Sequence, residues 1–139
     1  MPTPELLAHW FTFTPPVNEA DKDRHVKIRD AETVCAEAVS NAITAGDFPA
    51  ITTATFAFAT VINEQAPESA DKTAAIRCVR IARMAANEAV LQSRKIATAK
   101  TERQAGDLAT VANQCGGLAL QHLTLARYQA SASIALGGR

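Results

Sequence analysis

The sequence predicts an all-α protein, and three observations lead to this fold class. Hydrophobic residues make up 47% of the 139 residues, but aromatic residues make up only 5%. Much of the hydrophobic fraction is alanine, which favours helices, whereas strands favour β-branched and aromatic residues. Apolar residues also recur at helical spacing along most of the chain. We therefore expect one helical domain over residues 1–139, long enough to bury a core without disulfides or a metal.

The first segment, residues 1–17, contains four prolines and three closely spaced aromatic residues, Trp10, Phe11 and Phe13. The pair Pro15 and Pro16 predicts an extended exit from it, because a residue before proline avoids the α region. The aromatic side chains either fill a core or form the wall of a site for a flat ligand.

A helix is predicted over residues 21–43, because one helix face collects apolar side chains: Ile28, Ala31, Cys35, Ala38 and Ala42. Gly46 and Pro49 end this helix and begin the next segment. In segment 44–66, residues 51–62 contain many β-branched side chains and resemble a strand. However, Ile51, Thr55, Phe58 and Ile62 also follow helical spacing, and a lone strand would have no partner. We expect a helix over residues 50–64, with Pro49 in its first turn.

A long basic helix is predicted over residues 69–104. Ser69 is a suitable N-cap, and no glycine or proline occurs from Lys72 to Arg103. Its two apolar stripes are Ala74, Cys78, Ile81, Ala85 and Ala89, and Ile76, Val79, Ala86 and Val90. Two stripes indicate a helix covered on more than one side, as in a compact bundle or an oligomer. A C-terminal helix is expected over residues 107–136, with a stripe at 3-4-3-4-3 spacing: Leu108, Val111, Cys115, Leu118, His122 and Leu125.

The net charge is zero, so we expect no coating of DNA, which requires an excess of positive charge. Locally, however, residues 72–103 hold eight basic and two acidic residues, a net charge of +6. Arg80, Arg83, Asn87 and Arg94 follow one helix face, with Arg77 one turn earlier. These arginines either pair with the acidic residues of segment 19–37 or recognise phosphate. A second basic cluster, Lys22, Arg24, Lys27 and Arg29, follows the aromatic segment, and aromatic rings beside cations suit a nucleotide.

Motifs for catalysis or metal binding are lacking. The three histidines are scattered, and the sequence has no Walker loop, nucleophile elbow or zinc-protease motif. Cys35, Cys78 and Cys115 lack metal-ligand spacing, and we expect them to be reduced core residues. We also expect no signal peptide, because no basic start followed by an apolar run is seen, and no stretch approaches the roughly 20 apolar residues of a membrane helix. We therefore expect a cytosolic protein that is not an enzyme and has no cofactor, metal or membrane partner.

Two blocks of sequence resemble a known family. Residues 10–16 (WFTFTPP) lead into 24–30 (RHVKIRD), and residues 67–77 (PESADKTAAIR) lead into 84–87 (MAAN). This order resembles the small helical-hairpin phage proteins that act as cyclic-nucleotide sponges against the CBASS and Thoeris immune systems. About 50 residues match. The chain departs from the family pattern at Phe13 and Thr14, where Tyr-His is common, and at Asp71 and Ala85, which replace Glu and Trp.

The resemblance implies a helical-hairpin core, with an inserted segment at about residues 44–63 and an additional C-terminal helix. It further implies an oligomer, often a hexamer, in the host cytoplasm that binds cyclic di- or trinucleotides or cyclic ADP-ribose isomers without cleaving them. By position, the ligand contacts would come from Phe13, Thr14, Arg24, Lys27, Ser69, Lys72, Thr73 and Arg77. The alternatives are a helical assembly module that binds only protein and an enzyme that degrades such messengers.

Overall fold

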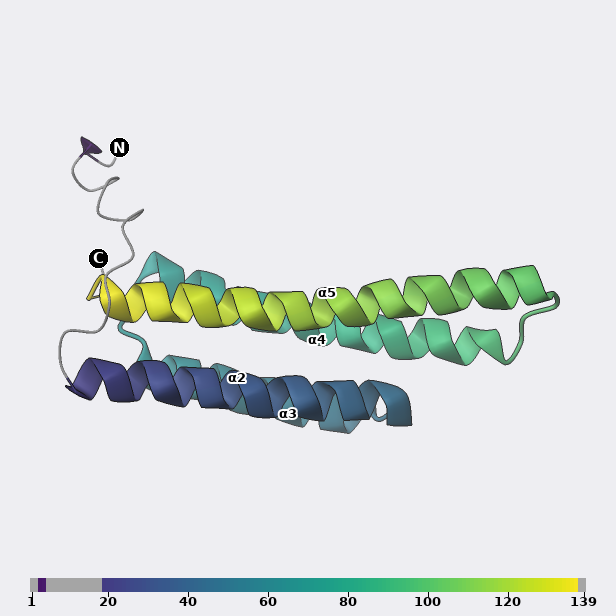
Figure 1. Cartoon of the computed structure of the whole chain (residues 1–139), viewed down its shortest axis with the longest axis horizontal. Coiled ribbons are helices and arrows are strands. Elements are labelled where there is room, and N and C mark those ends of the chain that lie inside the picture. The colour runs from purple at the N-terminus through teal and green to yellow at the C-terminus, as the bar shows by residue number, and fades with distance from the viewer. Residues whose placement is uncertain (1–2, 5–18, 138–139) are drawn as a thin grey trace.

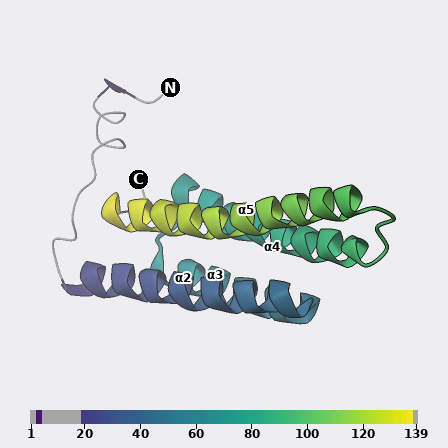
Figure 2. The same ribbon diagram turned by 45° about the vertical axis from the view of Figure 1, so that its right-hand side comes forward.

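The computed structural model describes residues 3–4 and 19–137, and the regular structure in this part of the chain is helical throughout. The long helices are α2 (Glu19–Ala45), α3 (Phe48–Gln65), α4 (Ala70–Ile96) and α5 (Glu102–Ala135). Consecutive helices run antiparallel, and α5 returns to pack against α2, so that the bundle closes (Figure 1). The α4–α5 hairpin extends past the end of the α2–α3 hairpin (Figure 2). The predicted all-α fold class is confirmed.

The turn between α2 and α3 has the structure that its sequence predicts. Gly46 adopts a φ of 68°, which favours glycine, and donates to the Ile43 carbonyl at 3.1 Å. The Asp47 N–H donates to the Ala42 carbonyl at 2.9 Å, which completes a Schellman motif. The Asp47 carboxylate then accepts from the Ala50 N–H and caps α3, with Pro49 in the first turn. Two residues therefore suffice to reverse the chain.

Helix α3 settles the ambiguity between helix and strand in favour of helix. Its buried residues are Ile51, Thr55, Phe58 and Ile62, the same four whose spacing predicted a helix. The Thr55 hydroxyl donates to the Ile51 carbonyl at 2.8 Å, which satisfies this buried polar group within the helix. The β-branched residues of this segment thus occupy a helix because tertiary burial outweighs their local preference.

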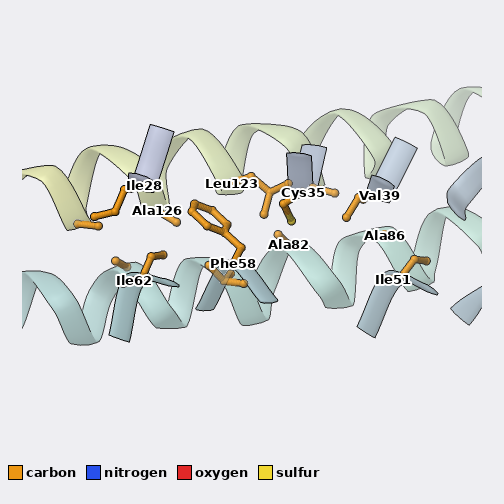
Figure 3. Close-up of a cluster of buried hydrophobic side chains, with 14 of the residues drawn as sticks. Ile28, Cys35, Val39, Ile51, Phe58, Ile62, Ala82, Ala86, Leu123 and Ala126 are labelled. Atoms are coloured by element: carbon orange, nitrogen blue, oxygen red, sulfur yellow. The ribbon is translucent and has the colours of Figure 1, made fainter. Parts of the chain in front are cut away.

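The centre of the bundle combines a few large side chains with many alanines. Phe58 lies in its middle, with its ring directed toward Leu123 and Ala126 of α5 (Figure 3). Helix α4 buries Ala75, Val79, Ala82, Ala86, Ala89 and Val90, and α5 buries Ala112, Ala119, Leu123, Ala126, Ala130 and Ile134. Alanine on both sides allows the α4 and α5 backbones to approach closely.

The predicted boundary between the last two helices was wrong. Helix α4 ends at Ile96 rather than at 104, and α5 begins at Glu102 and runs through Gly106. The Thr101 hydroxyl accepts from the Gln104 N–H at 3.1 Å, and the Gln104 side chain accepts from the Lys100 N–H at 2.8 Å. These bonds cap α5 in the manner of a capping box. A hydroxyl cap therefore separates the helices without glycine or proline.

The apolar face predicted for the last helix was also wrong. Val111, Leu118 and Leu125 keep 40%, 47% and 47% of their surface exposed, whereas the buried face of α5 consists mainly of alanine. The inner face must fit against α4 and α2 at close range, and small side chains permit this. The larger side chains consequently lie outside.

Two phenylalanines of α3 provide a test of this packing. Phe58→Ala removes a fully buried ring and is expected to lower the free energy of unfolding by about 3–5 kcal/mol. Phe56→Ala on the same helix removes a ring that is 72% exposed, so its effect is expected to stay within about 0.5 kcal/mol. Urea denaturation followed by circular dichroism measures both, and similar losses for the two variants would contradict the packing.

Candidate functional site

The structure brings the predicted ligand residues of α2 and α4 to the same end of the bundle, because both helices begin there (Figure 1). Arg24, Lys27, Thr73 and Arg77 are exposed at this end. However, α2 and α4 lie diagonally across the bundle, each packed mainly against α3 and α5. Their outward side chains therefore belong to helices that are not neighbours. The predicted residues Phe13 and Thr14 lie outside the described residues.

Ser69 and Lys72, also predicted as ligand contacts, are bonded within the chain. The Ser69 hydroxyl caps α4 by accepting from the Lys72 N–H at 3.1 Å and lies 2.7 Å from the Ser133 hydroxyl. Ser133 donates to the Pro67 carbonyl at 2.9 Å, so its own oxygen accepts the Ser69 proton. The turn before α4 is thus fixed to the end of α5. A ligand at Ser69 would have to displace these bonds.

Lys72 has an equally well-defined structural role. Its side chain is 7% exposed, and its ammonium lies 2.7 Å from Glu68 and donates to the Asn63 carbonyl at 3.0 Å. The carbonyl belongs to the last turn of α3, where backbone acceptors have no partner within the helix. Lys72 therefore links α4 to the C-terminal end of α3.

The arginines of α4 were expected either to pair with the acidic residues of segment 19–37 or to recognise phosphate. Among the described residues, Arg77, Arg80 and Arg83 form no ion pair. Instead, Glu32 of α2 pairs with Arg127 of α5, at 3.3 Å between Oε2 and Nε. The pairing alternative is therefore not observed for these three arginines.

Arg94, at the far end of the same helix, has a structural role. Its guanidinium donates to the Gly46 carbonyl at 3.1 Å and lies 4.7 Å from the centroid of the Phe48 ring. It thereby holds the α2–α3 turn against α4. The charged row on α4 divides into one structural arginine and three without a carboxylate partner.

Two of these three arginines line a pocket together with an exposed aromatic ring. The pocket, of about 150 Å³, lies between α3 and α4, with Phe56 on one side and Arg80 and Arg83 on the other. The Phe56 ring is 72% exposed, and both arginines are exposed. Thr52 also lines this pocket. An aromatic face beside two guanidinium groups can stack a flat ring and bind its anionic substituents.

Asn87 follows Arg83 by one turn on α4, and its side-chain oxygen is buried without a hydrogen-bond partner among the described residues. The sequence identified Arg80, Arg83 and Asn87 as one face. It did not identify Phe56. The signal was available, because Phe56 lies on the other side of α3 from the four residues whose spacing predicted burial.

The apolar groove between α2 and α3 is a different kind of pocket. It has a volume of about 310 Å³ and is lined by Ala31, Val34, Cys35, Ala54 and Phe58 among others, with Asp30 as its charged residue. Burial raises the pKa of the Cys35 thiol to about 12, with a smaller contribution from Glu32. Cys35 is buried as predicted, whereas Cys78 and Cys115 are half-buried, and none forms a disulfide. The groove lacks the cations that a nucleotide requires.

Neither a metal site nor a membrane-spanning helix is found among the described residues. In residues 3–4 and 19–137, no group of three His, Cys, Asp or Glu side chains is arranged to hold a metal ion. None of the helices described above is both long and apolar enough to span a membrane. Comparison with known proteins finds no matching family model, curated protein or solved structure.

The role of Lys72 can be tested by its effect on stability. Lys72→Met keeps an apolar stem but removes the ammonium, and we expect the free energy of unfolding to fall by about 1.5–3 kcal/mol, as for lost hydrogen bonds to a charged group. Lys27→Met, at an exposed position of α2, is the control and is expected to change it by less than about 0.5 kcal/mol. Equal stability of the two variants in urea denaturation would show that Lys72 is not structural.

Proposed function

We propose that the protein binds cyclic nucleotide messengers of host antiphage immunity and sequesters them without cleaving them. The observation that carries the proposal is the pocket between α3 and α4, which is lined by the exposed Phe56 and by Arg80 and Arg83. The resemblance of residues 10–30 and 67–87 to cyclic-nucleotide sponges supports the same ligand class. The pocket and the resemblance both favour a compact ligand that combines flat bases with phosphates.

Electrostatics supports an anionic ligand. Arg77, Arg80 and Arg83 succeed one another at three-residue intervals on α4, and like charges this close repel one another. Because no described carboxylate pairs with them, a bound phosphate would supply the missing negative charge. Stacking of a base on an aromatic ring adds about 1–3 kcal/mol per base. A cyclic nucleotide offers both interactions, and the pocket of about 150 Å³ would accept one base or phosphate group, with the rest of the ligand outside it.

Sequestration requires affinity and abundance rather than chemistry. A binding protein lowers the free messenger concentration by mass action when it is present in excess and binds more tightly than the immune effector. In this proposal the protein acts in the host cytoplasm as a homo-oligomer, of which a hexamer is the form that the resemblance implies. Helices α2 and α4 carry the two blocks that resemble the family, although in this bundle they lie diagonally and the hairpins are α2–α3 and α4–α5. Arg24, Lys27 and Arg77 are exposed at the bundle end and offer further contacts to phosphate.

A module that only assembles with protein is the second candidate. It is favoured by the exposed aliphatic residues of α5, Val111, Leu118 and Leu125. The two candidates differ in their response to ligand, because a sponge is stabilised by its messenger whereas an assembly module is not.

A ligand panel tests the proposed function. We expect at least one member of a set of cyclic di- and trinucleotides and cyclic ADP-ribose isomers, supplied in large excess, to raise the melting temperature. Chromatography after denaturation should recover that ligand intact, because the proposed mechanism breaks no bond. If no member raises the melting temperature, the sponge function is refuted, and a recovered hydrolysis product would indicate an enzyme instead.

Substitutions in the pocket test its part in binding. Arg83→Ala and Phe56→Ala are expected to weaken the active ligand about tenfold or more, since each removes roughly 1.5 kcal/mol or more of charge-assisted bonding or stacking. Arg103→Ala, an exposed arginine at the start of α5, is the control and should bind as the wild type does. Isothermal titration calorimetry measures the affinities. If Lys27→Ala and Arg77→Ala lose binding while Arg83→Ala and Phe56→Ala keep it, the ligand binds at the bundle end and not in the pocket.

A further inference from the structure

Helix α5 presents a row of large side chains on its outer surface. Val111, Leu118 and Leu125 follow one another at intervals of seven residues, and each keeps 40–47% of its surface exposed. Gln114, Gln121 and Tyr128 lie three residues after each of them and are also exposed. We call these six residues the α5 stripe. Alternation of three and four residues over more than two heptads is the spacing of a coiled-coil seam.

Five of the six stripe residues lie in a part of the chain that has no charged residue, whereas Tyr128 follows Arg127, whose guanidinium lies 4.5 Å from the centroid of the Tyr128 ring. Between Asp107 and Arg127, the 19 residues 108–126 contain no Asp, Glu, Lys or Arg. The exposed face of a helix at a protein surface normally carries charges, whereas the core of a protein–protein interface is depleted in them. The absence of charge therefore points to a helix face that another protein surface covers.

Neighbouring residues of α4 widen this apolar surface. The Cys78 thiol donates to the Gln129 side chain at 3.2 Å, which sets the register between α4 and α5. Ile81, one turn after Cys78, and Leu125, one turn before Gln129, consequently lie alongside each other, and Ile81 is exposed as well. The apolar surface is about 27 Å long, from residue 111 to residue 128 of α5, and about 20 Å wide, because it covers the two helices α4 and α5. The resulting area of about 540 Å² is about two thirds of the roughly 800 Å² per partner that a standard interface buries.

We propose that the α5 stripe of one chain packs against the same stripe of a second copy. A self-complementary patch of this kind gives a two-fold symmetric contact, with Leu118 at its centre and the leucine and valine residues interlocking on either side. Gln114 and Gln121 lie between the aliphatic residues and fix the register by hydrogen bonds across the contact. This contact is independent of the nucleotide pocket, whose residues belong to α3 and α4.

Light scattering coupled to size-exclusion chromatography tests the contact on the full chain. We expect the wild-type mass to be an even multiple of 14.7 kDa and the mass of Leu118→Glu and Leu125→Glu to be half of it or less. Asn113→Glu introduces the same charge at an exposed position of α5 outside the stripe and should keep the wild-type mass. A monomeric wild-type protein, or stripe variants with the wild-type mass, would overturn the proposal.

A milder substitution keeps the proposal testable if a glutamate variant does not fold. Leu118→Ala is expected to raise the dissociation constant between the copies about tenfold or more in sedimentation equilibrium, with unchanged helicity by circular dichroism. The same dissociation constant in Leu118→Ala and Asn113→Ala would refute the contact. The ligand panel is read separately, because the dissociated variant keeps Phe56, Arg80 and Arg83.

Discussion

The close contact between α4 and α5 is the constraint on which the rest of the structure depends. Both helices bury rows of alanine there, and small side chains allow long stretches of the two backbones to run side by side. This choice leaves only a few large residues, above all Phe58, Ile62 and Leu123, to fill the centre of the bundle. It also assigns the aliphatic residues of α5 to the outside, where they are available to another molecule. The close packing of α4 and α5 therefore determines both the core of the bundle and the apolar surface of α5.

Much of the fold can be predicted from the sequence because its local signals agree with one another. Gly46, Asp47 and Pro49 each support the same turn, and the four apolar positions of α3 have a single helical phase. Two features could not be predicted from periodicity. The cap at Thr101 involves ordinary residues, and the larger leucines of α5 form a stronger apolar pattern than the alanines that are actually buried. An apolar pattern identifies a helix face that avoids water. It does not tell whether this face packs inside the same chain or against another molecule.

The candidate site could be predicted in part for a similar reason. The sequence singles out the arginines of α4 as a group, but their roles depend on what lies opposite each of them. Arg94 meets a carbonyl and an aromatic ring, whereas Arg80 and Arg83 meet the open pocket beside Phe56. Lys72 resembles its basic neighbours in the sequence, yet burial and the Asn63 carbonyl make it structural. A pattern of basic residues in the sequence therefore locates a charged helix face. Tertiary contacts decide which of these residues are free to bind a ligand.

The hydroxyl bond between Ser69 and Ser133 joins positions 64 residues apart. During synthesis the first three long helices emerge before the end of α5, so the turn ahead of α4 must wait for its partner. Until then, the backbone carbonyl of Pro67 depends on water for its hydrogen bond. Until the end of α5 is present, this end of the bundle therefore lacks both hydrogen bonds that Ser133 forms with the turn before α4.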